Sequence, residues 1–136
     1  MSIELIPLCT VEATLTDPIV VGEGPSGLRL IYEVVEATVE GERLSGTFIG
    51  HASGDWVSLI GTIASLDVRG TFQTHDGAIV FVHYRGRTNI AEGGTIYVAP
   101  LFETGDPRYA WLNAIQGAGK GILDGTHLRY EWFELR

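Results

Sequence analysis

Three charged side chains near the middle of the chain could carry out acid–base chemistry. Asp67 and Arg69 stand two residues apart, and Asp55 precedes them in the chain. Residues two apart on a strand share one face, so Asp67 and Arg69 can form an ion pair there. If that face lines a cavity, Arg69 keeps one carboxylate ionised, while a second carboxyl in a drier place has a raised pKa and can exchange protons. The same pattern also fits the solvent face of a strand.

These residue types define the candidate catalytic group. Asp55 or Asp67 would act as the base, and Arg69 would stabilise negative charge that develops on an oxygen. The candidates for substrate binding are polar or aromatic, since such side chains offer a flat apolar surface with a polar tip. Core packing explains most of the aromatic ones equally well. They are Trp56, Thr74, Asp76, His83, Phe102, Tyr109, Trp111 and Asn113.

We expect neither a metal site nor a cofactor. The four histidines lack the spacing of a metal-binding pair, and the acid–base chemistry above needs no cofactor. The lone Cys9 lies in an apolar run and is expected to be a buried, inert thiol. The glycine-rich run from Gly117 to Gly121 lacks the spacing of a phosphate-binding loop, so we expect a turn there.

The charge balance excludes several kinds of partner. Seventeen acidic and nine basic residues give a net charge of −8, and the only basic cluster is Arg85 with Arg87, so nucleic acid is a poor partner. The apolar runs are too short to span a bilayer, and residues Met1 to Leu8 do not read as a signal peptide. We therefore expect a cytoplasmic protein with a small-molecule ligand and no membrane partner; the sequence is compatible with a homodimer.

The pattern along the chain is that of many short strands. Eighteen glycines punctuate runs rich in Val, Ile, Thr, Tyr and Phe. Tight turns are expected at Thr74 to Gly77, at Gly41-Glu42 and at Gly93-Gly94. The predicted strands are Leu8 to Leu15, Leu28 to Glu40, Leu44 to Ile49, Val57 to Ile63, Leu66 to Thr74, Ala78 to Arg85, Thr95 to Thr104 and His127 to Leu135.

We predict an all-β fold, a single antiparallel calycin- or lipocalin-like β-barrel that spans residues 1–136. Successive antiparallel strands remove their exposed edges by closing into a barrel, and 136 residues suffice for one core. Only Pro107 to Gln116 has near-helical spacing, so we expect at most a short helical turn that packs its aromatic residues against one mouth. Small barrels of this kind hold one ligand inside.

Six short motifs in a fixed order resemble the family called domain of unknown function 3237, or uncharacterised protein family 0311. The resemblance covers nearly the whole chain and implies a lipocalin-like barrel with Asp67 and Arg69 facing the pocket. Some fungal members resemble polyketide-pathway enzymes that close an oxygen ring by adding a hydroxyl across an alkene. The motifs are Pro25-Ser26-Gly27-Leu28-Arg29, Gly41 to Leu44 with Gly46, Gly54-Asp55-Trp56, Leu66-Asp67-Val68-Arg69, Thr74-His75-Asp76-Gly77-Ala78, and Phe102-Glu103-Thr104 with Tyr109-Ala110-Trp111-Leu112-Asn113.

Together these features predict a small-molecule-binding barrel. The favoured function is a cofactor-free enzyme that cyclises a phenolic or polyketide-like substrate by intramolecular hydroalkoxylation, or a related lyase or isomerase. Replacing Asp67 or Arg69 would then abolish turnover. The alternative is a carrier of a small apolar metabolite, which needs the aromatic wall but no acid and base. A structural, oligomerising domain with a filled core is the third option.

Overall fold

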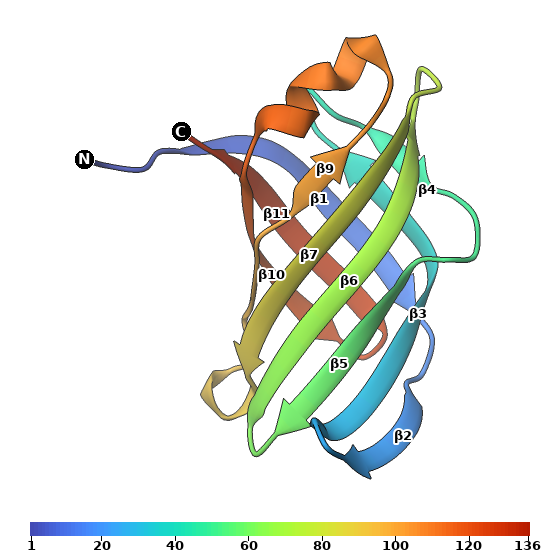
Figure 1. Cartoon of the computed structure of the whole chain (residues 1–136), viewed down its shortest axis with the longest axis vertical. Coiled ribbons are helices and arrows are strands. Elements are labelled where there is room, and N and C mark those ends of the chain that lie inside the picture. Colours follow the sequence, from blue (N-terminus) through green and yellow to red (C-terminus); the bar gives the residue numbers. More distant parts are fainter.

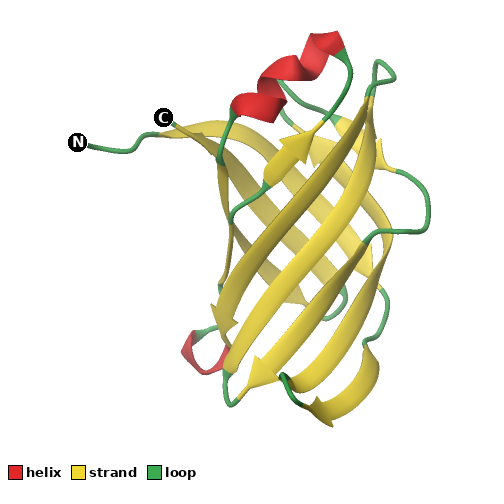
Figure 2. Cartoon of the chain, in the orientation of Figure 1, coloured by secondary structure: helices red, strands yellow, loops and turns green.

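The computed structural model describes all 136 residues, and strands make up most of it (Figures 1 and 2). Two short 3-10 helices interrupt them. The strands are β1 (Leu5–Leu15), β2 (Ile19–Gly24), β3 (Gly27–Glu40), β4 (Gly46–Phe48), β5 (Gly54–Ile60), β6 (Ile63–Thr74), β7 (Ile79–Asn89), β8 (Ile96–Val98), β9 (Leu101–Glu103), β10 (Gly117–Asp124) and β11 (His127–Leu135), and the helices are η1 (Ile90–Glu92) and η2 (Pro107–Ala114).

The strands close into an antiparallel barrel with eight positions. Neighbouring positions run in the order β1, β3, β5, β6, β7, β8, β10 and β11, and β11 pairs with β1 to complete the ring. The short β4 shares the place of β5 between β3 and β6, β9 also pairs with β7, and β2 pairs with β3. The predicted all-β barrel is therefore confirmed. No helix is long and apolar enough to cross a membrane.

The two ends of the barrel differ. At one end, helix η2 lies across the opening (Figure 1), and the lumen beneath it is filled by large side chains such as Phe72, Leu112 and Trp132, each at most 1% exposed. The predicted helical turn against one mouth is confirmed at this η2 end. The opposite end carries β2, η1 and the turn between β5 and β6. We call it the β2 end.

The turn predicted at Gly117 to Gly121 is wrong, because this run belongs to strand β10. Its glycines serve close packing rather than chain reversal. A Cβ on Gly119 would lie 2.5 Å from Cδ1 of Trp132, and one on Gly121 would collide with the ring of Tyr130. These residues are cross-strand partners in β10 and β11, so each ring lies over the bare backbone of a glycine.

Other differences concern strand limits. β2 was not predicted, and the strand expected from Thr95 to Thr104 is divided into β8 and β9 at Ala99 and Pro100. Proline has no N–H to donate to the ladder, so pairing is interrupted there. β5 begins at Gly54, three residues before the predicted start at Val57. Asp55 therefore lies within a strand, and the alternation of that strand decides which way its side chain points.

Candidate functional site

The lumen keeps one largely apolar cavity, with a volume of about 260 Å³. A larger hollow of about 620 Å³ lies outside, beside Arg43, but charged and polar residues line much of it. Most of the inner cavity wall is aliphatic, and the wall comes from strands all round the barrel. The lining residues are Leu15, Leu30, Tyr32, Asp55, Val57, Leu59, Ala64, Leu66, Thr88, Ile90, Ile96, Leu123, Leu128 and Tyr130.

Asp55 is the only carboxyl group that lines this cavity. In β5, Asp55 and Val57 are buried, while Trp56 between them is exposed, so alternation turns the carboxyl inward. Asp55 is 8% exposed, and its Oδ1 accepts a hydrogen bond of 3.2 Å from the backbone N–H of Asp67. Burial raises the pKa of Asp55 to about 7; the N–H contact lowers it, and the negative charge of Asp67 raises it.

Hydroxyl groups share the cavity with this carboxyl. Tyr130 is 1% exposed and lies against Tyr84, with 5.7 Å between ring centres, while the buried Oγ1 of Thr88 has no protein hydrogen-bond partner. Burial, and secondarily the charge of Asp55, raises the pKa of Tyr130, while a hydrogen bond with Tyr84 lowers it. Burial and the charge of Asp55 also raise the pKa of Tyr32. These phenols therefore stay protonated at neutral pH.

The prediction that Asp67 and Arg69 face the lumen is wrong. Along β6 the buried residues are Ala64, Leu66 and every second residue after them, which leaves Asp67 and Arg69 on the outer wall. Oδ1 of Asp67 lies 2.9 Å from Nε2 of His83, and both side chains are about 40% exposed. Register explains the placement, because a slip by one residue would bring the charges inside and expel the apolar residues.

His83 and Trp56 also lie outside. The side chain of His83 contacts that of Asp67 on the outer face of the barrel. Trp56 is 38% exposed on the face of β5 opposite Asp55. Their predicted role in lining the lumen is therefore wrong. In both strands the inward positions are taken by the neighbours, since adjacent residues point to opposite faces.

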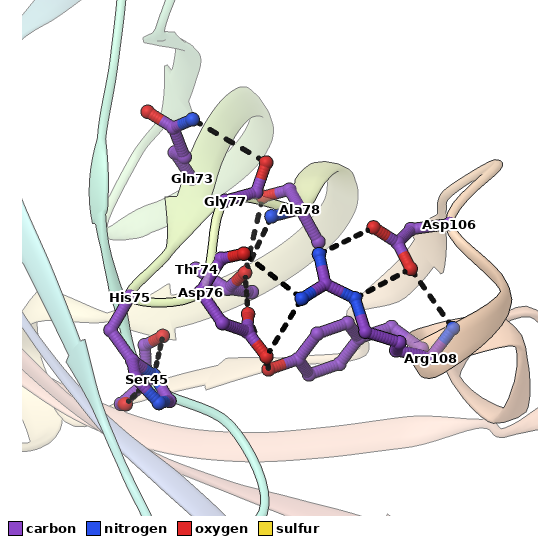
Figure 3. Close-up of polar contacts among 10 residues, drawn as sticks. Ser45, Gln73, Thr74, His75, Asp76, Gly77, Ala78, Asp106 and Arg108 are labelled. Carbon is purple, nitrogen blue, oxygen red and sulfur yellow. Dashed lines mark hydrogen bonds and ion pairs between the residues drawn. The ribbon is translucent and has the colours of Figure 1, made fainter.

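Three more candidates hold η2 in place (Figure 3). Asp76, in the β6–β7 turn, accepts hydrogen bonds from the hydroxyls of Thr74 at 2.6 Å and of Tyr109 at 2.9 Å. Arg108 reaches across to the carbonyl of Asp76 at 3.0 Å while it pairs with Asp106, which caps η2. The hydrogen bond from Thr74 foremost, then that from Tyr109 and the charge of Arg108, lower the pKa of Asp76. The cluster closes the η2 end and does not line the cavity.

The remaining candidates are structural too. Phe102 is 5% exposed and packs edge-on against Trp132, with 5.7 Å between ring centres. Trp111 has the guanidinium of Arg43 5.0 Å from its ring centre. Asn113 exchanges two hydrogen bonds with the backbone of Thr104. None of the three lines the cavity, so the predicted pocket roles of Phe102, Trp111 and Asn113 are not supported by their positions.

The residues predicted to bind a substrate did not include the hydroxyl-bearing residues of the cavity, although Tyr130 was considered as part of an aromatic wall. The alternation along His127 to Leu135 already places Tyr130 and Trp132 on one face, and a buried tyrosine beside glycine-rich β10 was a usable signal. Thr88 and Tyr32 carried no such signal, because each becomes a lining residue only through the position of its strand in the closed ring.

The fold and the cavity define a closed antiparallel β-barrel with one largely apolar interior cavity that a single carboxyl group, that of Asp55, lines. The chain belongs to the DUF3237 family, described as a protein of unknown function, whose profile matches residues 3–135. The UPF0311 protein RPA1785 of Rhodopseudomonas palustris is 29% identical over 118 residues, which cover 76% of this chain and 77% of that protein. The UPF0311 protein blr7842 of Bradyrhizobium diazoefficiens is 27% identical over the same shares.

Solved structures share this fold. A β-barrel-like protein from Acinetobacter baumannii AYE is 25% identical, with a TM-score of 0.90 over 100% of this chain and 98% of that one. An enzyme from Penicillium herquei is 22% identical, with a TM-score of 0.76 over 98% and 93% of the two chains. The predicted family and its barrel are therefore confirmed.

Proposed function

We propose that this protein is a cofactor-independent enzyme that uses Asp55 to move a proton within a small, mostly apolar molecule held in the barrel. One observation carries the proposal: Asp55 is the only carboxyl group that lines the largely apolar cavity, and burial there raises its pKa to about 7. At neutral pH both of its protonation states are well populated, which suits a group that gives up a proton and takes one back. Apolar walls would keep water away from the reacting atoms.

The proposed reaction is an intramolecular addition of a hydroxyl group to an alkene. The neutral carboxyl of Asp55 delivers its proton to one alkene carbon, and the hydroxyl oxygen forms a bond to the other carbon. The hydroxyl proton then passes to the Asp55 carboxylate, which restores the starting state. The product is an isomer of the substrate, so no co-reactant is consumed.

Because Arg69 points outward, the two proton transfers should occur in a different order from the one expected from the sequence. No lysine or arginine lines the cavity, so an oxyanion formed there would lack a positive partner. This favours protonation of carbon by the neutral acid over initial removal of the hydroxyl proton. The Penicillium herquei enzyme has the same fold, which supports a catalytic use of such a barrel.

A carrier is the second candidate, because almost all of the cavity wall is apolar. It would bind the same molecules and return them unaltered. The two functions differ in whether Asp55 exchanges its proton with carbon, so the test must follow that proton.

The test uses 2-allylphenol and related alkenyl phenols in deuterium oxide, analysed by mass spectrometry and chiral chromatography. The wild-type protein should form a cyclic ether with one deuterium on carbon. The Asp55→Asn variant should lose about 10²- to 10⁴-fold of this rate, because it has no transferable proton. The matched control, Asp67→Asn, changes a carboxyl on the outer wall and should keep the rate. Equal rates in both variants would refute the role of Asp55, and recovery of bound but unaltered phenol would favour the carrier.

A further inference from the structure

We propose that one outer wall of the barrel docks on the opposite outer wall of a second copy of this chain, so that the copies associate front to back. The docking face presents unpaired arginines and exposed aromatic rings, and the receiving face presents carboxylates around a hollow. The basic wall consists of Trp56, Arg69, Arg85, Arg87 and Tyr97, and the acidic wall consists of Glu12, Glu40, Glu42 and Glu131. This interface lies outside the barrel and does not depend on the proposed chemistry.

The basic residues of the chain divide into two groups. Four of the nine form ion pairs with carboxylates of the same chain, and they are Arg43, Arg108, Arg129 and Arg136. The other five form no ion pair, and they are Arg29, Arg69, Arg85, Arg87 and Lys120. Three of these five belong to the basic wall, so most of the uncompensated positive charge of an acidic chain lies on one face.

Strand register brings the three arginines of the basic wall together. In the pairing of β6 with β7, Arg85 lies opposite Asp67, and Arg69 lies opposite His83. The carboxylate of Asp67 forms its ion pair with His83 and with neither arginine. Arg87 stands two residues beyond Arg85 on the same outward face of β7. These guanidinium groups are therefore free to bind the carboxylates of another molecule.

Exposed aromatic rings flank the arginines. Trp56 on β5 is 38% exposed, and Tyr97 on β8 is 59% exposed. Tyr97 lies opposite Arg87 on one side and Lys120 on the other, so the positive face extends across β8 to β10. Protein interfaces are enriched in Trp, Tyr and Arg, and these residues supply much of the binding energy. The composition of the basic wall therefore fits a protein partner with an acidic face.

The acidic wall of this chain offers such a face. On the outside of β1, Thr10 lies between Glu131 of β11 and Glu40 of β3. Glu12, the next outward residue of β1, pairs with Arg129 at 2.8 Å between Oε1 and Nη1. The other glutamates of the acidic wall form no ion pair. Negative charge is thus left uncompensated on this wall, as positive charge is on the basic wall.

Two hollows on the acidic wall share Glu40 and Glu42. One has a volume of about 470 Å³, and no hydrophobic residue lines it. The other, of about 620 Å³, is also lined by Glu131 and by apolar residues such as Ile6. A guanidinium group would find carboxylate acceptors in the first hollow, and an aromatic ring would find apolar surface in the second. The acidic wall therefore matches both kinds of side chain that the basic wall presents.

The two walls face away from each other, so one chain cannot bring them together. In the closed ring of strands, β6 and β7 lie opposite β11 and β1, and Figure 1 shows the first pair in front of the second. A contact between two different faces is heterologous, and it repeats to form a closed ring or an open chain of copies.

The net charge of −8 opposes association, but salt limits its reach. In about 0.15 M salt the Debye length is about 8 Å. Packed sheets lie about 10 Å apart before their outer side chains are added, so the far wall of each copy is screened. Each copy therefore interacts mainly through the wall that faces its neighbour, where opposite charges meet.

The test measures self-association of the full chain by sedimentation equilibrium at neutral pH. The wild-type protein should associate in about 0.15 M NaCl, and its association constant should fall at least about tenfold in about 1 M NaCl, where the Debye length is about 3 Å. The combined Arg85→Gln and Arg87→Gln variant should lose at least about tenfold in about 0.15 M NaCl, because it removes two of the docking charges.

The matched control is the combined Thr62→Glu and Thr126→Glu variant. Both threonines are exposed and lie in turns outside the two walls. The control makes the net charge more negative by the same amount as the glutamine variant, and it should associate like the wild type. Circular dichroism and thermal unfolding should show that all variants keep the fold.

A charge exchange then identifies the receiving wall. The variant with Arg85→Glu and Arg87→Glu and the variant with Glu40→Arg and Glu42→Arg should each fail to associate alone. A mixture of the two should associate, because each variant keeps the wall that complements the unchanged wall of the other.

Three outcomes would overturn the proposal: a wild-type protein that stays monomeric, equal association of the glutamine variant and the threonine control, or a mixture of the exchange variants that stays monomeric. A monomeric wild type that binds poly-glutamate through Arg85 and Arg87 would assign the basic wall to a different acidic protein. Association that persists in about 1 M NaCl would indicate an apolar contact elsewhere and would likewise refute the proposed interface.

Discussion

Replacing Asp55 with asparagine should stabilise the protein at alkaline pH and not at acid pH. Burial raises the pKa of Asp55 from 3.8 to about 7, so the folded state holds a proton that the unfolded state has released across this range. The free energy of unfolding contributed by Asp55 is fully present below pH 3.8 and is lost as the pH rises toward 7. At 1.36 kcal/mol for each tenfold change in proton concentration, the loss amounts to about 4 kcal/mol.

Asparagine is a close mimic of the protonated acid. Its Oδ1 can still accept the N–H of Asp67, which now donates to Asp55 over 3.2 Å. The variant therefore keeps the contact and removes the pH dependence. At pH 8 it should exceed the wild type in free energy of unfolding by about 4 kcal/mol, and near pH 4 the two should be similar.

Urea unfolding followed by tryptophan fluorescence between pH 4 and pH 8.5 measures this difference. Other carboxyls cancel when the two proteins are compared at each pH. They include Asp76, whose lowered pKa gives a contribution of the opposite sign that is lost at acid pH. A gap between the two proteins that stays constant from pH 4 to pH 8 would refute the raised pKa of Asp55, and with it the basis of the proposed chemistry.

Three further changes test the barrel around the cavity. Gly119→Ala places a Cβ 2.5 Å from the ring of Trp132 and should lower the free energy of unfolding in urea by about 1–3 kcal/mol, whereas Gly105→Ala, with no atom within 4 Å, should not. Ala64→Leu puts three more carbons into the cavity and should weaken 2-allylphenol binding at least about tenfold by dialysis. Tyr109→Phe should speed amide hydrogen exchange in η2 without changing that binding.

The barrel was predictable because its rules are local. Glycine-punctuated β runs indicate strands, and the β6–β7 turn is marked by Gly77, whose φ of +97° favours glycine. Edge avoidance then leads to closure. The same local rule failed at Gly117 to Gly121, since a glycine that leaves room for a ring on the next strand looks in sequence like a glycine that turns the chain.

The site was less predictable because alternation gives two faces without saying which is inside. Asp67 and Arg69 were correctly grouped on one face of a strand, but the face was the outer one. The opposite face, with Ala64 and Leu66, is apolar, and burying apolar side chains is favourable, so this face was the better prediction for the interior. Asp55 was a candidate from its sequence, yet its inward direction follows only from the start of β5 at Gly54.

The hydrogen bond to the Asp67 N–H does not by itself require a carboxyl at position 55. An amide would accept the same N–H and would avoid the cost of ionisation above pH 7. What only a carboxyl adds is a proton that is gained and lost near neutral pH, inside a cavity whose walls are otherwise mostly apolar. Asp67 does not lie in such a cavity, because it contacts His83 on the outer wall with 40% of its side chain exposed. The physical case for chemistry therefore lies with Asp55, on the inner side of β5.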